Sequence, residues 1–110
     1  FRTVGKHVRP GTARLVIADP PWNRDALALW PDIAACAADV LMDGGVLVVQ
    51  PPLPYLPDVV AALGHRLQYR WTVALFRGDP CPLVMSEQIM NGWLPVLIYS
   101  KGVVGPLHIR

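Results

Sequence analysis

The sequence predicts an α/β fold in which apolar strands alternate with helices along a chain of 110 residues. Three observations predict this fold. Short apolar runs rich in β-branched residues recur between segments with helical spacing. One of these runs, residues 46–49, has no polar face, as expected for a strand inside a parallel sheet. The resulting order of strand, helix, strand, helix, strand, loop, strand implies a layered α/β sandwich.

The composition is that of a folded domain with a substantial core. Hydrophobic residues make up 53% of the chain and charged residues 16%, and the twelve prolines fall at the borders of apolar segments. This balance argues against disorder, and the length allows one domain over residues 1–110. No apolar run approaches the ~20 residues of a membrane-spanning helix, and the start of the chain has no signal-peptide pattern. We therefore expect a soluble cytoplasmic protein with no membrane partner.

The first half of the chain is predicted to form a strand, a helix and a second strand. The strand at residues 15–18 stops at two consecutive prolines, which lack the N–H that a strand ladder needs. After a polar loop at residues 23–25, a helix is expected from about Pro31 to Met42, with proline at its first position. The Asp-Gly-Gly sequence at residues 43–45 is expected to end this helix in a turn before the strand at residues 46–49.

The second half is predicted to continue the alternation. Residues 51–57 have the composition of a stiff, extended, proline-rich connector, or alternatively of a ligand for aromatic grooves. A helix is expected from Pro57 to Gly64, followed by an alternating strand at residues 67–75 whose polar face places it near a sheet edge. Residues 77–92 have no convincing period, and the final strand covers residues 94–100.

The segment Asp19-Pro20-Pro21-Trp22 directly follows the first predicted strand and is the main candidate for an active site. Asp19 supplies a carboxylate, and the stiff ring of Pro21 holds the direction of the Pro20 carbonyl. Trp22 adds a large flat aromatic surface. An amine on a planar base can donate to both acceptors while the base stacks on the aromatic ring. The alternative interpretation is an ordinary Asp-Pro-Pro turn after a strand.

This motif resembles the D-P-P-[W/Y/F] motif of amino-group methyltransferases that use S-adenosylmethionine. The nearest branch modifies the exocyclic amine of adenine in DNA or RNA. A second, less specific resemblance lies in residues 93–102, which look like the late strand of that family running into a Lys-Gly turn. The resemblance implies a Rossmann-like methyltransferase sandwich, partial or minimal, with a mostly parallel sheet and an antiparallel final strand pair.

The same resemblance implies a role for each residue of the motif. Asp19 and the carbonyl of Pro20 would accept hydrogen bonds from the target amine, Pro21 would act as a rigid spacer, and Trp22 would stack on the flipped base. The implied cofactor is S-adenosylmethionine, for which Asp19 and Lys101 are the candidate contacts.

The Gly-rich cofactor loop of the family is missing from the sequence. Gly44 and Gly45 precede their strand instead of following it, so they form a turn and not a cofactor loop. In the branch that this chain resembles, the loop would lie beyond Arg110. We therefore expect a fragment of a larger enzyme, or a reduced relative that cannot methylate alone.

Charge and cysteine usage allow two weaker inferences. The net charge is only +2, but basic residues without a carboxylate among them crowd the start of the chain, where they would contact phosphates or form a solvated end. These basic residues are Arg2, Lys6, His7, Arg9 and Arg14. Cys36 and Cys81 belong to no Cys/His cluster, so no metal site is expected.

The leading hypothesis is a DNA adenine-N6 methyltransferase, which transfers a methyl group from S-adenosylmethionine to the exocyclic amine of a flipped adenine. DNA is preferred to RNA as the nucleic-acid partner because stand-alone enzymes of this kind are common in bacteria and phages. One alternative is methylation of the cytosine amine, although such enzymes more often have Ser in place of Asp19. The other is a non-catalytic methyltransferase-like module that binds nucleic acid or protein.

Overall fold

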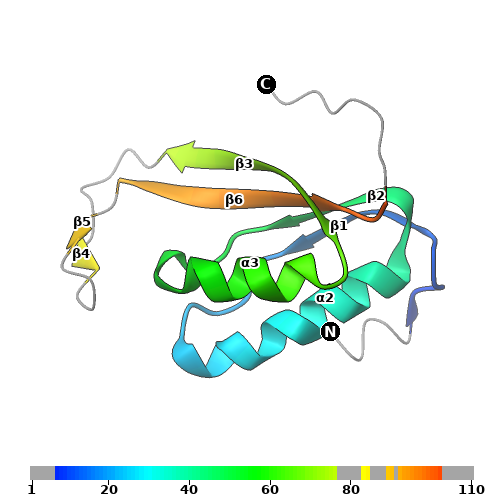
Figure 1. Ribbon diagram of the computed structural model, residues 1–110, viewed down its shortest axis with the longest axis horizontal. Helices are drawn as coiled ribbons and strands as arrows, with labels where there is room; N and C mark the ends of the chain where they lie inside the picture. Colours follow the sequence, from blue (N-terminus) through cyan, green and yellow to red (C-terminus); the bar gives the residue numbers. More distant parts are fainter. Residues whose placement is uncertain (1–6, 77–82, 85–88, 91, 103–110) are drawn as a thin grey trace.

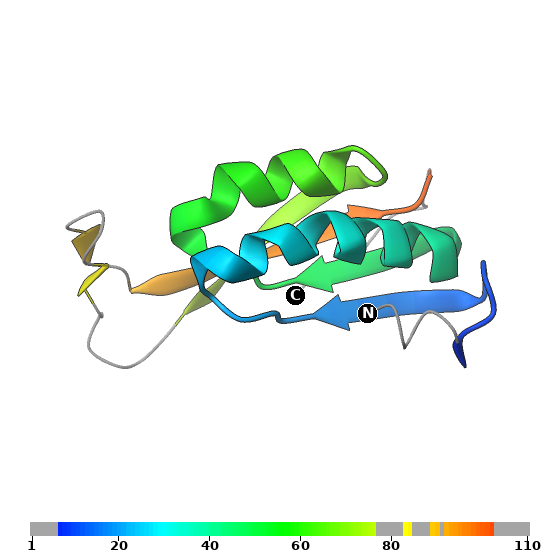
Figure 2. The same cartoon turned by 90° about the horizontal axis from the view of Figure 1, so that it is seen from below.

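The computed structural model describes residues 7–76, 83–84, 89–90 and 92–102. Within them, two α-helices lie against one face of a four-stranded sheet (Figure 1, Figure 2). In chain order, with η for a 3-10 helix, the elements are β1 (Ala13–Ala18), η1 (Arg24–Ala28), α2 (Leu29–Val40), β2 (Leu41–Val49), η2 (Leu53–Tyr55), α3 (Leu56–Gly64), β3 (Gln68–Phe76), β4 (Leu83–Val84), β5 (Ile89–Met90) and β6 (Trp93–Ser100).

The strands of the main sheet are arranged in the order β1-β2-β6-β3. β1 and β2 are parallel, and β6 pairs antiparallel with both β2 and β3. Three strands therefore share one direction and β6 runs against them, which confirms the predicted sandwich with its antiparallel final pair. β3 lies at one edge, as its alternating sequence predicts, and β1 lies at the other. The short strands β4 and β5 form a separate antiparallel pair.

The core lies between the sheet and the two helices. Parallel strands need a crossover connection, and α2 supplies it between β1 and β2 while covering the sheet with its apolar face. The largest side chain in this core is Trp30, in the first turn of α2, which is 1% exposed. The buried cluster also includes Ile33, Ala34, Ala37, Leu41, Leu47, Val49, Val59, Leu63, Leu67, Leu97 and Tyr99.

Tyr99 closes the core on the β3 side. Its ring meets the ring of Tyr69 edge to face, with centroids 5.6 Å apart. Burial, and secondarily the neighbouring Tyr69, raises the pKa of the Tyr99 phenol above its usual value. Tyr99 therefore stays neutral at physiological pH and acts as an apolar core residue.

The predicted bounds of the first helix were wrong by two residues at each end. α2 begins at Leu29 and ends at Val40, because Leu41 is already extended and pairs with Ala13 of β1. Backbone N–H groups of residues 11 and 12 donate to the carbonyls of residues 39 and 40, at 2.9 and 3.0 Å, and so satisfy the end of the helix. Residues 43–45 consequently belong to β2 and do not form a separate turn.

The proline-rich connector is also less extended than its composition predicts. Residues 53–55 form the 3-10 turn η2, in which the Tyr55 N–H donates to the Pro52 carbonyl at 3.0 Å. Pro51 and Pro52 are both less than 2% exposed. Their burial anchors the chain between β2 and α3, and it leaves neither ring free for an aromatic groove.

Gly44 and Gly45 have separate structural reasons to be glycine. Gly44 has a φ of 82°, a left-handed backbone conformation that residues other than glycine rarely adopt. Gly45 lies in the irregular stretch between the Ala13–Leu41 and Leu15–Val46 pairs, and a Cβ there would lie 2.9 Å from the Met42 carbonyl oxygen and 3.0 Å from that of Ala13. The pair therefore shapes the start of β2.

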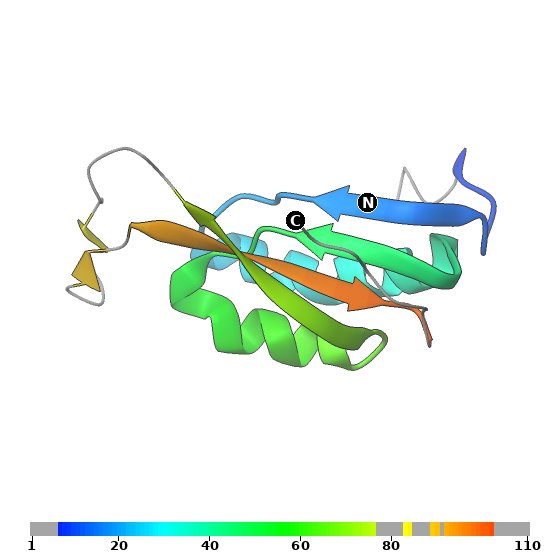
Figure 3. The same cartoon turned by 90° about the horizontal axis from the view of Figure 1, so that it is seen from above.

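The sheet face opposite the helices carries an apolar row that crosses all four strands. The register aligns Ile17 of β1 with Val48 of β2, Val48 with Ile98 of β6, and Ile98 with Trp71 of β3. Ile17 is 71% and Trp71 61% exposed. Among the described residues no helix covers this face, which is toward the viewer in Figure 3. We call it the open face.

We expect Gly45→Ala to destabilise the chain by about 1–3 kcal/mol, because the new methyl group cannot fit between two backbone carbonyls. Gly64→Ala is the matched control: a Cβ at Gly64 meets nothing within 4 Å, and alanine favours the helix end by up to about 1 kcal/mol. Urea unfolding followed by circular dichroism measures both changes. Equal effects of the two substitutions would contradict the close approach at Gly45.

We also expect the double variant Ile17→Thr, Trp71→Thr of the 110-residue chain to bind less of the dye anilinonaphthalene sulfonate, which reports exposed apolar surface. The free energy of unfolding should change by less than about 1 kcal/mol, since both side chains already face water. The control Leu47→Thr alters a fully buried residue on the other face and should cost about 2 kcal/mol or more. Unchanged dye binding in the double variant would show that the open face is covered.

Candidate active site

A pocket of about 470 Å³ lies where β1 and β2 end. This volume is within the range of small-ligand sites. The position also fits the rule that open α/β sheets bind ligands beyond the carboxyl ends of their strands. The residues that line the pocket are Asp19, Pro20, Pro21, Trp22, Gln50 and Leu94. The structure thus brings all four residues of the predicted motif into one pocket and adds two others.

Asp19 reaches the pocket because the parallel ladder ends just before it. Ala18 pairs with Val49, and the N–H of Gln50 then donates to the Ala18 carbonyl at 3.2 Å. Pro20 prevents β1 from continuing, so the carboxylate of Asp19 is presented at the end of the sheet. Among the residues that the structure describes, no side chain or backbone group pairs with this carboxylate. It is exposed and available to accept hydrogen bonds.

The rest of the motif has one buried anchor and one exposed platform. Pro20 is buried, which fixes its backbone, whereas Trp22 is 42% exposed. The segment that follows the motif is also fixed, because the Asn23 side chain accepts a hydrogen bond from the Ala26 N–H at 2.8 Å. Asn23 is the N-cap of η1, which begins at Arg24. Residues 24 and 25 therefore belong to a 3-10 helix and not to the polar loop that the sequence predicts.

The sequence reasoning missed Gln50, although a signal was present. The sequence Gln50-Pro51-Pro52 repeats the pattern Asp19-Pro20-Pro21: each of the two parallel strands ends in a polar residue followed by two prolines. Two parallel strands that end in the same way present their last polar residues side by side.

Leu94 forms the wall of the pocket on the other side. The pairing of β2 with β6 reaches only as far as Val49 and Leu97, whereas β6 continues beside β3 to Trp93. Leu94 therefore lies on a part of β6 that extends past the end of β2. Nothing in the sequence indicated that this apolar position belongs to the site, because its place depends on strand order.

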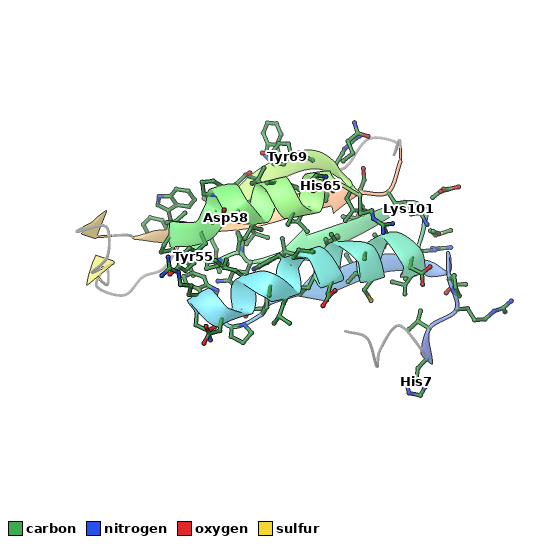
Figure 4. The ribbon with its side chains drawn as sticks, turned by 60° about the horizontal axis from the view of Figure 1, so that its bottom comes forward. His7, Tyr55, Asp58, His65, Tyr69 and Lys101 are labelled. Atoms are coloured by element: carbon green, nitrogen blue, oxygen red, sulfur yellow. The ribbon has the colours of Figure 1, made fainter. Side chains whose placement is uncertain are left out.

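Lys101, the second expected cofactor contact, lies at the other end of the sheet. The backbone N–H of Lys101 donates to the carbonyl of Gly45 at 3.0 Å, and its side-chain Nζ donates to the carbonyl of Leu41 at 3.0 Å. Gly45 and Gln50 are five residues apart on β2, which corresponds to about 16 Å. Figure 4 shows Lys101 far from Tyr55, which follows the pocket end of β2. The structure thus separates Lys101 from Asp19 and gives it a structural contact.

The remaining candidates lie outside the pocket. His7 and Arg9 precede β1 and Arg14 is near its start, so all three are far from the end that carries Asp19. Arg2, Lys6 and Cys81 fall outside the described residues. Over the described part of the chain, no group of three or more side chains is placed to hold a metal ion. In the same residues, no helix is long and apolar enough to cross a membrane.

Several solved structures that share this fold are methyltransferases. TTHA0409 of Thermus thermophilus, a candidate DNA modification methylase solved with S-adenosyl-L-methionine, matches 99% of this chain with a TM-score of 0.72 and 14% identity. M1.HpyAVI, solved as a complex with SAM, matches 92% of it with a TM-score of 0.64 and 15% identity. A predicted O-methyltransferase, Atu636 of Agrobacterium tumefaciens, matches 91% with a TM-score of 0.61 and 18% identity.

The chain spans about half the length of these neighbours: 54% of TTHA0409, 49% of M1.HpyAVI and 41% of Atu636. No family model matches the sequence, and no curated protein matches it.

We expect Lys101→Met to lower the free energy of unfolding by about 0.5–1.5 kcal/mol, because it removes the hydrogen bond to the Leu41 carbonyl. Ligand binding at the pocket should be unchanged, since Lys101 lies beside the opposite end of β2. Arg66→Met, on an exposed residue after α3, is the control and should change stability by less than about 0.5 kcal/mol. Urea unfolding measures the stability, and titration with a ligand of the pocket measures the binding. Weakened binding with unchanged stability would show that Lys101 contributes to the site.

The three structural neighbours are all methyltransferases, and each shares its fold with 91–99% of this chain. At identities of 14–18% this likeness concerns the fold. The chain therefore has part of the Rossmann-like fold of methyltransferases.

Proposed function

We propose that this chain is the base-binding part of a methyltransferase that uses S-adenosylmethionine to modify the N6 amine of adenine in DNA. The observation that carries this proposal is the pocket at the ends of β1 and β2, in which Asp19, Pro20 and Trp22 meet. Two acceptors beside an aromatic surface match an amine on a planar ring. The fold supports the reaction class, and the neighbours described as DNA modification enzymes support DNA as the substrate.

The pocket fits a base better than it fits the whole cofactor. Among the lining residues that the structure describes, Asp19 is the only charged side chain, and no glycine-rich turn that could cradle a ligand lies there. A nucleoside with an amino-acid tail needs partners for its ribose hydroxyls and for two charged groups. We therefore propose that, within the described part of the chain, Asp19 contacts S-adenosylmethionine, whose role is to supply the methyl group.

The chemistry of the site follows from its acceptors. The exocyclic amine of adenine is a poor nucleophile because its lone pair is conjugated with the ring. Hydrogen bonds from the two amine hydrogens to the Asp19 carboxylate and the Pro20 carbonyl hold the nitrogen in place and favour a geometry in which the lone pair leaves conjugation. Trp22 fixes the ring plane by stacking. Positioning of this kind can lower the barrier without a strong general base.

A second candidate function is a non-catalytic module that binds nucleic acid or protein. Its support is that, among the described lining residues, only Asp19 carries a charge that could hold the cofactor. The intact Asp19 favours the enzyme, since catalytically silent methyltransferase-like modules typically lose the acidic residue. Calorimetry with S-adenosylmethionine on the longest natural form of the chain separates the two functions, and absence of binding would favour the module.

We expect Asp19→Ala, in the longest natural form of the chain, to reduce methyl transfer to DNA by about 100-fold or more, since it removes a preorganised partner of the reacting group. Cofactor affinity should fall much less. Asp39→Asn is the control, because Asp39 lies at the far end of α2, away from the pocket. Single-turnover methylation and calorimetry measure the two effects. Methyl transfer by Asp19→Ala at the normal rate would remove Asp19 from the mechanism.

A further inference from the structure

Gln50 lies beside Asp19 at the end of the sheet and lines the same pocket. Both residues precede a proline, which restricts them to an extended backbone. They are in equivalent positions on paired parallel strands, and the Gln50 N–H is bonded to the Ala18 carbonyl. Neighbouring strands are about 4.8 Å apart, so the two side chains can reach adjacent atoms of one small ring.

The amide of Gln50 is available for a ligand. The residue is half-buried, and its side chain has no hydrogen-bond partner within the part of the chain that the structure describes. The backbone on both sides is fixed, by the ladder before it and by the buried pair Pro51 and Pro52 after it. A free amide on a fixed backbone is already in position to bind, so little ordering entropy is lost when it does.

The two side chains offer complementary chemistry. The Asp19 carboxylate only accepts hydrogen bonds, whereas the Gln50 amide has an NH2 group that donates. A base that satisfies both must have an amine donor next to an acceptor on the same edge. Adenine has this pattern twice, as its amine lies between N1 and N7, and cytosine has it once. Thymine and the O6 edge of guanine present a carbonyl there, which the carboxylate repels. The amine of guanine lies on the other edge, beside N3.

We propose that Gln50 selects the base together with Asp19: its amide donates to the unprotonated ring nitrogen beside the exocyclic amine, while Asp19 accepts from the amine. The pocket would then accept bases with an amine next to a ring acceptor and reject bases with a carbonyl in that place. This inference rests on the proposed function, since it assigns a selective contact within the same base site.

The test compares binding of single-stranded DNA with one test base among abasic positions, using the longest natural form of the chain. The wild-type protein should bind adenine more tightly than hypoxanthine, its counterpart with a carbonyl. Gln50→Leu should weaken adenine binding about three- to tenfold, the effect of one net hydrogen bond. Gln68→Leu, the same change on an exposed glutamine at the start of β3, is the control and should have no effect. Circular dichroism checks that the variants are folded.

Analogues of adenine that lack one ring nitrogen make the test specific. If Gln50 donates to N1 or to N7, the corresponding 1-deaza or 7-deaza analogue should bind the wild type about three- to tenfold more weakly than adenine. Gln50→Leu should bind that analogue and adenine equally well, because the contact is already lost. Equal penalties in both proteins for both analogues would overturn the proposal.

The same experiment separates this inference from the proposed function. Asp19→Ala should abolish the preference for adenine over hypoxanthine by removing the acceptor of the amine. Suppose that the wild type shows that preference but Gln50→Leu keeps the full penalty for both deaza analogues. The proposed base site is then supported and the proposed role of Gln50 is wrong. If the wild type shows no preference at all, both fail.

Discussion

The parallel pairing of β1 with β2 is the interaction on which the site and much of the fold depend. It requires a crossover, which α2 provides, and that crossover brings the apolar face of α2 onto the sheet. The same ladder sets Ala18 level with Val49, so the residues that follow each strand meet at one end. The close approach of the strands at Gly45 and the capping of α2 by residues 11 and 12 belong to this arrangement.

The prolines convert this end of the sheet into a fixed binding surface. A strand that stops at a proline leaves its last residue extended and without a further ladder bond. Here this happens on both parallel strands, and Pro20, Pro51 and Pro52 are buried as anchors. The polar side chains before them are therefore held by backbone geometry and need no side-chain network. A site built in this way can present a carboxylate and an amide to the same small ring.

The open face distinguishes this chain from a complete two-sided α/β sandwich. Its row from Ile17 to Trp71 leaves apolar surface in water, at a cost of roughly 25 cal/mol for each Å² that could otherwise be buried. All the buried residues of the main cluster lie on the other face, with the helices.

The sequence by itself determined the order and type of the four strands of the main sheet and the two α-helices, and the motif at Asp19, because periodicity, β-branched runs and double prolines act locally. The edge position of β3 was also predicted, and the resemblance to methyltransferases implied the antiparallel final pair. Only the tertiary structure decided that Gln50 and Leu94 join the site and that Lys101 does not, since strand order and register bring together residues that are far apart in the chain. It also decided where α2 ends and that Trp71 faces outward, because both depend on pairing with other strands. Local preferences cannot specify these long-range contacts: the Gln50-Pro51-Pro52 pattern is visible in the sequence, but only the pairing of β1 with β2 places Gln50 beside Asp19.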